Sequence, residues 1–181
     1  MIGEILYTLR RLRWKYRLNH LGKNVRIEKG VIIINPKAIS IGDYSWIDRY
    51  TILEGGNGIK IGRYVHICSF CHIQGGTEVE IGDYACIASG SKIYSDTNYY
   101  TKRMSSALPI EQQEIKKGKV IIEKDAFIGL NSVVLPGVKI GEGAVIGANS
   151  LVNKDIPSWT IAVGSPARVI KKRPKHNLPD I

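Results

Sequence analysis

The sequence predicts an all-β fold in which short parallel strands stack as the coils of a solenoid. Aliphatic residues return at every sixth position, and they do so in successive sets: Ile41, Ile47 and Leu53, then Ile61, Ile67 and Ile73. A four-residue opening recurs every twenty positions, as Ile41-Gly42-Asp43-Tyr44, Ile61-Gly62-Arg63-Tyr64 and Ile81-Gly82-Asp83-Tyr84. Repetition at a fixed period indicates a repeat architecture. A period of six excludes an α-helical stripe, which repeats every 3.6 residues.

Each six-residue unit has an aliphatic residue at its first position and a small residue at its fifth. Counted from Ile61, the fifth positions hold Val65, Cys71, Ala85 and Ser91. We therefore expect a short strand that turns a corner every six residues, with large side chains inside and small ones at the tight corners. Three units make one triangular coil, and stacked coils bury a continuous core that no single coil could bury.

Every third side of the predicted triangle is longer than the others. Ile33 to Ile41 and Ile73 to Ile81 each span eight positions (41−33 and 81−73), whereas Ile93 to Ile122 spans 29 (122−93). We expect a long loop, about 94–119, to leave the stack at the same corner as the shorter bulges. Loops of this length in compact domains are usually functional or disordered. On a rigid stack, this one is predicted to be functional.

The two ends of the chain differ from the predicted coil, which covers 21–163. Residues 1–20 are predicted to form a short basic amphipathic helix, and residues 164–181 form a basic tail. The helix either caps the open end of the solenoid or lies on an anionic membrane surface; it is too short and too charged to span a bilayer. Its apolar positions are Ile2, Ile5, Leu6, Leu9, Leu12 and Tyr16.

The amino-acid composition indicates which ligands the protein binds and in which compartment it works. The 181 residues are 44% hydrophobic, which suits one domain, and the net charge of +10 gathers at both ends and in the long loop. Such clusters favour phosphate-bearing ligands or anionic surfaces. Nucleic acid is not expected as a partner, because no basic helix or aromatic sheet of a known binding module is present. Three cysteines without an export signal predict a cytoplasmic protein, with peripheral membrane contact through residues 1–20 as the alternative.

The segment from His66 to His72 contains two cysteines and two histidines. A tetrahedral metal site needs its ligand atoms to converge. Cys71 is a fifth-position residue that should face the core, and the two histidines should lie on different outer faces. We therefore predict no metal site. Either His66 or His72 is instead a candidate general base, because imidazole titrates near neutral pH.

The start of the long loop combines hydrogen-bonding and aromatic residues, Ser95-Asp96-Thr97-Asn98-Tyr99-Tyr100. This mixture would suit a sugar site, although a polar surface loop of turn-forming residues has a similar composition.

Residues 138–157 and the ending Ala162-Val163-Gly164-Ser165-Pro166-Ala167-Arg168-Val169-Ile170 carry a family resemblance. Over about residues 22–173 the chain resembles the hexapeptide-repeat acyltransferases, whose fold is a left-handed parallel β-helix. The resemblance implies a homotrimer with active sites between subunits and acetyl-CoA as the donor. It also implies acetyl transfer to a hydroxyl or amino group of a sugar, or of a nucleotide- or lipid-linked sugar, in surface polysaccharide biosynthesis.

The resemblance also assigns residues. It implies that acetyl-CoA lies along the coil edge, with its phosphates near the basic tail; the residues are Gly129, Leu130, Ala148, Asn153, Lys154, Arg168 and Lys171. Sugar O-acetyltransferases of this superfamily usually carry their catalytic histidine in the long loop, but residues 94–119 contain none. The Ser95-Asp96 segment, with His66 upstream, instead resembles a subset found with polysaccharide and nucleotide-sugar biosynthesis. We therefore expect the base to be His66, with His72 as substitute and Asp96 as its partner or a sugar ligand. Substrate contacts are then expected from Ser95, Asn98 and Tyr99.

Transfer to a hydroxyl group is favoured here, but an amine that is already deprotonated needs less help from a base, so transfer to an amino group stays open. Two other functions remain as alternatives. The coil could be a catalytically silent trimeric scaffold or binding module. It could also resemble the metal-dependent carbonic anhydrases built on the same coil, which require three histidines facing one groove, where this chain offers two candidates.

Overall fold

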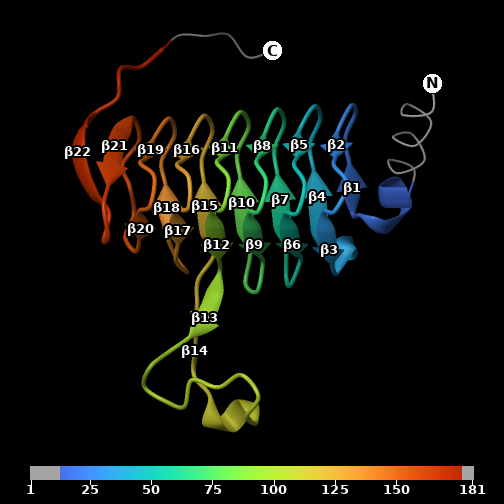
Figure 1. Cartoon of the computed structure of the whole chain (residues 1–181), viewed down its shortest axis with the longest axis vertical. Helices are drawn as coiled ribbons and strands as arrows, with labels where there is room; N and C mark the ends of the chain where they lie inside the picture. Colours follow the sequence, from blue (N-terminus) through green and yellow to red (C-terminus); the bar gives the residue numbers. More distant parts are fainter. Residues whose placement is uncertain (1–12, 177–181) are drawn as a thin grey trace.

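The computed structural model, which describes residues 13–176, is a left-handed parallel β-helix of about seven coils (Figure 1). Its three flat sides are three sheets, and each coil contributes one short parallel strand to each sheet, as the six-residue period predicts. The last strand of one sheet, from the C-terminal tail, is antiparallel. Sheet A contains β1 (His20–Leu21), β4 (Ile39–Ile41), β7 (Ile59–Ile61), β10 (Val79–Ile81), β15 (Val120–Ile122) and β18 (Lys139–Ile140).

Sheets B and C complete the triangle. Sheet B contains β2 (Arg26–Ile27), β5 (Trp46–Ile47), β8 (His66–Ile67), β11 (Cys86–Ile87), β16 (Phe127–Ile128), β19 (Val145–Ile146), β21 (Thr160–Val163) and β22 (Arg168–Lys172). Sheet C contains β3 (Ile32–Ile34), β6 (Ile52–Glu54), β9 (His72–Gln74), β12 (Lys92–Tyr94), β17 (Val133–Val134) and β20 (Leu151–Val152). A short 3-10 helix, η1 (Pro36–Ala38), widens the first corner between sheets C and A.

The core is the stack of first-position aliphatic residues. Ile41, Ile47 and Leu53 have no exposed surface, and the same holds for their equivalents in the next coil, Ile67 and Ile73. Fifth-position side chains are buried as well, and the serines among them donate to backbone carbonyls; Ser91 Oγ lies 2.9 Å from the Gly129 oxygen. The predicted division into large interior and small corner residues is confirmed.

The recurring tyrosine of the four-residue opening occupies the corner between sheets A and B. Tyr44, Tyr64 and Tyr84 adopt left-handed backbone conformations, with φ of 60°, 55° and 62°. Such strain in a bulky residue persists only where the surroundings impose it. Here the rings stack from coil to coil, with centroids 4.9 Å apart for Tyr44 and Tyr64 and 5.4 Å apart for Tyr64 and Tyr84. Each stacked pair contributes about 0.5–1.5 kcal/mol beyond its buried area, which offsets part of the strain.

The described part of the N-terminal segment caps the coil. Residues 13–17 are helical, and Trp14 and Leu18, which are 7% and 2% exposed, join the hydrophobic core. Tyr16 is 76% exposed, so its assignment to the apolar face is wrong; Trp14 and Leu18, four positions apart, form that face instead. Residues 1–12 of the predicted helix lie outside the described range. Within that range no helix has the length and apolar content needed to cross a membrane.

Truncating the cap should weaken the whole stack. We expect Trp14→Ala to lower the free energy of unfolding by about 3 kcal/mol, the lower end of the range for removing a buried tryptophan side chain. The exposed neighbour Tyr16→Ala is the matched control and should change it by no more than about 0.5 kcal/mol. Urea unfolding followed by circular dichroism measures both. Equal effects of the two substitutions would contradict a capping role.

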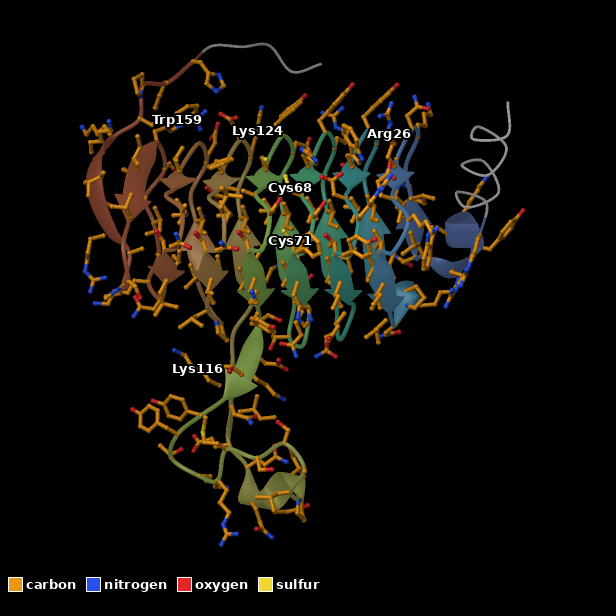
Figure 2. The ribbon with its side chains drawn as sticks, viewed as in Figure 1. Arg26, Cys68, Cys71, Lys116, Lys124 and Trp159 are labelled. Atoms are coloured by element: carbon orange, nitrogen blue, oxygen red, sulfur yellow. The ribbon has the colours of Figure 1, made fainter. Side chains whose placement is uncertain are left out.

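The predicted loop leaves between β12 and β15, at the corner that carries the pairs Gly55-Gly56 and Gly75-Gly76 in earlier coils. Its stem is an antiparallel hairpin of β13 (Asp96–Asn98) and β14 (Ile115–Lys117), and its far end holds the 3-10 helix η2 (Ile110–Gln112). Figure 1 shows the hairpin projecting away from the coil, and Lys116 marks its stem in Figure 2. The stem is pinned at its base, where the Gly118 amide donates to the Ser95 carbonyl over 3.0 Å.

The C-terminal tail folds back on the last coils. Strand β22 pairs antiparallel with β21, and beyond it Arg173 donates to the carbonyls of Asp125 and Gly143 over 3.0 and 2.9 Å. The Arg173 guanidinium also lies 5.4 Å from the centre of the Trp159 ring. This part of the basic tail therefore has a structural role, whereas the side chains of β22 are exposed.

Candidate active site

A hollow of about 530 Å³ lies where the hairpin leaves the coil. Sheet C supplies Gln74 and Tyr94 to its wall, and the hairpin supplies Asp96, Asn98 and Gln113. Carboxylate, amide and phenol groups thus face one space that is open to solvent. Asp96 is the one acidic side chain among the described lining residues, so a cationic group of a ligand would be drawn to it.

The position of Asp96 depends on a glycine in the coil below. A Cβ atom built on Gly76 would lie 2.0 Å from Asp96 Oδ2, a distance that real side chains do not tolerate. Glycine at position 76 therefore lets the carboxylate lie against the corner. The sequence predicts a short bulge at this corner, and the structure shows that Gly76 also makes room there for the Asp96 carboxylate.

The other predicted loop ligands have different surroundings. Ser95 is fully buried; its hydroxyl accepts from the Thr77 amide over 2.9 Å and donates to the Gln74 carbonyl over 3.0 Å. A direct contact with substrate would require these bonds to break, so Ser95 holds the corner in place. Asn98 lines the hollow, but its amide donates to Ser106 Oγ over 3.0 Å and orders the loop. Tyr99 is not among the lining residues, and its hydroxyl donates to that of Tyr100.

His72 lies behind the hollow on sheet C. Its Nε2 is 2.9 Å from Glu54 Oε1, and its Nδ1 is 2.9 Å from the Tyr94 hydroxyl. Because a carboxylate only accepts, Nε2 carries the proton toward Glu54 in the neutral ring, and Nδ1 accepts from Tyr94. His72 thus has no free lone pair, and its Nδ1 is bonded to Tyr94, one of the residues that line the hollow. Burial, and secondarily the charge of Glu54, raises the pKa of Tyr94.

His66 lies on a different face. On sheet B it is stacked between Trp46 one coil below and Cys86 one coil above, as the twenty-residue spacing predicts. Its Nε2 is 3.1 Å from Asp48 Oδ2. The expected partnership between His66 and Asp96 is not found within one chain, because Asp96 follows sheet C and the carboxylate beside His66 is Asp48.

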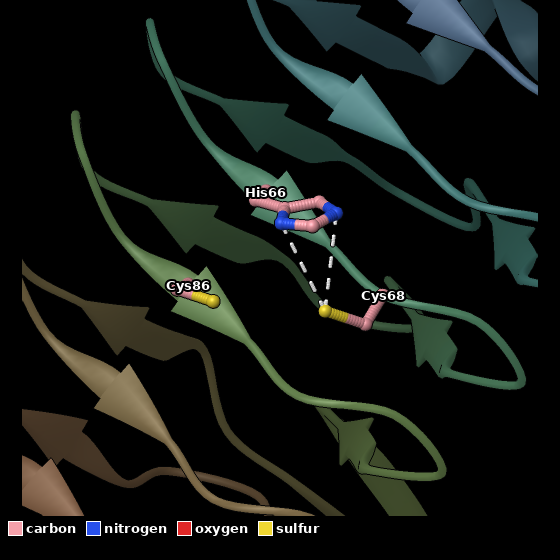
Figure 3. A group of neighbouring side chains, drawn as sticks. All are labelled: His66, Cys68 and Cys86. Carbon is pink, nitrogen blue, oxygen red and sulfur yellow. Dashed lines mark hydrogen bonds between the residues drawn. The ribbon is translucent and has the colours of Figure 1, made fainter.

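Two cysteines lie next to His66 (Figure 3). Cys68 Sγ is 3.9 Å from each ring nitrogen, and Cys86 completes a group whose ligand atoms all lie within 4.8 Å of one another. Burial, followed by the charge of Cys68, raises the pKa of Cys86 to about 11. The sequence argument against a metal considered Cys71 and His72, and both do face elsewhere. It left out Cys86, although the twenty-residue repeat places Cys86 one coil from His66 (86−66).

The residues implied for acetyl-CoA fall into separate rows. Gly129, Leu130 and Ala148 lie at the corner between sheets B and C, whereas Asn153 and Lys154 follow β20 at the corner between sheets C and A. A Cβ on Gly129 would come within 2.6 Å of the Ala148 nitrogen, so glycine permits the close stacking of this row. The remaining two, Arg168 and Lys171, are exposed on β22. The two corners are at opposite ends of sheet C, so one chain does not bring these rows together.

Known proteins are similar to this chain in fold and in sequence. The model of the hexapeptide repeat of succinyl-transferase matches residues 119–154. The dTDP-4-amino-4,6-dideoxy-D-glucose acyltransferase of Escherichia coli is 40% identical over 161 residues, which cover 87% of this chain and 84% of that protein. The chain belongs to the hexapeptide-repeat acyltransferases. The predicted family, fold class and enzyme class are thereby confirmed.

Two solved structures of acyltransferases extend the comparison. A variant of AntD, an N-acyltransferase from Bacillus cereus, superposes with a TM-score of 0.88 at 38% identity, covering 93% of this chain and 91% of AntD. It was crystallised with dTDP-4-amino-4,6-dideoxyglucose and coenzyme A. A hexapeptide-repeat acetyltransferase of Vibrio cholerae, in complex with acetyl coenzyme A, gives a TM-score of 0.63 at 27% identity and covers 93% of this chain and 78% of its own.

Proposed function

We propose that this acyltransferase transfers an acetyl group from acetyl-CoA to the amino group of a nucleotide-linked amino sugar of the dTDP-4-amino-4,6-dideoxyglucose class. The observation that carries the proposal is the 40% identity to an acyltransferase of that sugar over 161 residues. The hollow beside Asp96 supports it, since a carboxylate attracts the ammonium form of an amino sugar. We further propose that the acylated sugar enters surface polysaccharide synthesis and that the enzyme is cytoplasmic.

The chemistry requires few protein groups. The amino nitrogen attacks the thioester carbonyl carbon, a C–N bond forms, the C–S bond breaks, and coenzyme A leaves as its thiol. Asp96 holds the ammonium and takes one of its protons, which frees the nitrogen lone pair for attack. The second proton lost from the nitrogen passes to the departing thiolate, so that coenzyme A leaves as its thiol. A backbone N–H at a tight corner would stabilise the oxyanion, an effect of about 2.7–4 kcal/mol in other acyl-transfer sites. An amine acceptor also accounts for a long loop without histidine.

The assembly we propose is a homotrimer. Large apolar side chains stand on the outer faces of two sheets: Ile32 and Ile34 on sheet C are 52% and 51% exposed, and Trp46 and Phe127 on sheet B are 39% and 37% exposed. A cyclic trimer joins two different surfaces of the same chain. The two rows of residues implied for acetyl-CoA could then line one groove between neighbours, with Arg168 near the phosphates.

Paired acceptors test the proposal. We expect kcat/KM to be at least about 100-fold higher for dTDP-4-amino-4,6-dideoxyglucose than for the dTDP sugar with a hydroxyl at the same carbon, a difference of about 2.7 kcal/mol. The reason is that only the amine presents a cation to Asp96. Mass spectrometry of the products measures both rates. Comparable rates of transfer to the hydroxyl would favour the hypothesis of O-acetylation. Failure to bind acetyl-CoA in a calorimeter would favour the hypothesis of a catalytically silent scaffold.

A further inference from the structure

We propose that His66, Cys68 and Cys86 form a zinc-binding site on the outer face of sheet B. Their ligand atoms lie within 4.8 Å of one another, and Cys68 Sγ is 3.9 Å from His66 Nδ1 (Figure 3). Zinc bonds of about 2.0–2.1 Å to nitrogen and 2.3 Å to sulfur, in a tetrahedron, separate the ligand atoms by about 3.6–3.8 Å. To bind the ion, the distances between the ligand atoms therefore need to shorten by amounts that range from a few tenths of an ångström up to about 1 Å.

A hydrogen bond to Asp48 orients the His66 ring and fixes which of its nitrogens can bind a metal. Asp48 Oδ2 lies 3.1 Å from His66 Nε2, so the proton of the neutral ring sits on Nε2 and the Nδ1 lone pair is left for a metal. Histidines that bind metals in proteins typically donate their other N–H to such a carboxylate, which fixes the ring and raises its basicity. The carboxylate also attracts a dication. After burial, its charge is among the causes that raise the pKa of Cys68 and Cys86, so the two thiols would lose their protons as the ion binds.

The coil holds the three ligands on a rigid frame. His66 and Cys86 are paired neighbours on β8 and β11, and Cys68 follows β8 directly. The Trp46 ring stacks on the imidazole with centroids 5.1 Å apart and covers it from the coil below. Two sulfurs and one imidazole are a donor set that suits zinc. Three protein ligands leave a fourth position for water, and in the single chain the His66 side chain, 39% exposed, leaves room for it.

This site goes beyond the proposed acyl transfer. It lies on sheet B, whereas the hollow beside Asp96 lies at the corner between sheets C and A, and zinc at Nδ1 would occupy the lone pair that a base needs. A zinc-loaded chain therefore cannot use His66 as its general base. Metal binding and acyl transfer can be measured separately, so the failure of one proposal does not decide the other.

The test uses the full chain, kept reduced by a phosphine and freed of metal by a chelator. Titration with Zn²⁺ should give one tightly bound ion per chain, and Co²⁺ should give the absorption band of thiolate-to-cobalt charge transfer. Cys68→Ser and Cys86→Ser should each weaken Zn²⁺ binding at least 100-fold and abolish that band. Asp48→Asn should weaken binding by about 10- to 100-fold, the usual effect of losing the carboxylate behind a ligating histidine.

Cys71→Ser is the matched control. The Cys71 thiol faces the interior and donates to the Ala88 carbonyl over 3.2 Å. One coil further on, Ser91 occupies the same position and donates to the Gly129 carbonyl over 2.9 Å, so a serine fits there. Zinc affinity should be unchanged in this variant.

Two results would overturn the proposal. The first is the absence of a thiolate-to-cobalt band in the native chain, which requires no variant to fold. The second is stoichiometric Zn²⁺ binding that survives both outer-face cysteine substitutions, which would place the ion elsewhere, for example at His176 and Asp125, whose Nε2 and Oδ2 lie 2.6 Å apart.

Discussion

Asp96→Asn is expected to lower kcat/KM for the amino sugar by about 100-fold or more. The substitution keeps the shape of the side chain and one acceptor oxygen, but it removes the negative charge that would hold the acceptor's ammonium group. A hydrogen bond to a charged group contributes about 1.5–3 kcal/mol, which corresponds to roughly 10- to 150-fold. If the carboxylate also accepts the proton during attack, the loss extends to about 10²–10⁴-fold.

The kinetic parameter that changes separates these two contributions. Loss of ammonium binding alone should appear mainly as a higher KM, whereas loss of proton acceptance should lower kcat as well. Steady-state rates at saturating acetyl-CoA, with the acetylated sugar quantified by mass spectrometry, give both values. Mass spectrometry is preferable to a thiol reagent because the chain has three cysteines of its own.

Glu111→Gln is the control, because it removes an equivalent charge from the same loop. Glu111 is exposed in η2 and is not among the residues that line the hollow. Its loss should change kcat/KM less than twofold. If Asp96→Asn also proved silent, Asp96 would have no role in acceptor binding and the hollow would lose its assignment as the acceptor site.

The coil was predictable because its rules are local and repeat. An aliphatic residue at one position and a small one four positions later are enough to place Ile67 inside, Cys71 beneath a corner, and His66 on an outer face, all as observed. The twenty-residue spacing also predicts the neighbours above and below His66 correctly. Each coil buries its side chains in the same way, so the same residue pattern occurs several times in the sequence.

The site was less predictable because it depends on contacts that no repeat encodes. The carboxylate that pairs with His66 comes from the preceding coil, and both nitrogens of His72 are occupied by Glu54 and Tyr94, which are set by side-chain direction. The loop occurs once in the sequence, so no repeating pattern predicts its antiparallel stem. The predicted apolar face of the N-terminal helix was wrong at Tyr16 for a similar reason. Trp14 packs against the core instead, because residue spacing alone does not determine how the helix is rotated about its axis.

Removing the hairpin should abolish acyl transfer and leave the coil folded. Deletion of residues 97–116 would join Asp96 to Lys117, so that five residues, 95, 96 and 117–119, connect β12 to β15. The coil below makes the equivalent turn, from β9 to β10, with four residues, 75–78. The stem ends are already adjacent, since the Gly118 amide donates to the Ser95 carbonyl over 3.0 Å. The pairing of Val79 with Val120 across sheet A therefore need not change.

We expect the melting temperature of this variant to stay within a few degrees of the native value, because none of the deleted residues belongs to the hydrophobic core. Transfer should fall by about 10³-fold or more, since the hollow loses the hairpin side that would position the acceptor against the donor. A full-length variant in which only the exposed Lys102 and Arg103 are replaced by alanine should keep most of its activity. Thermal melts and product mass spectrometry measure the two properties independently. Native rates in the deleted chain would show that the acceptor binds on a flat face of the coil, and the hairpin would then have no part in catalysis.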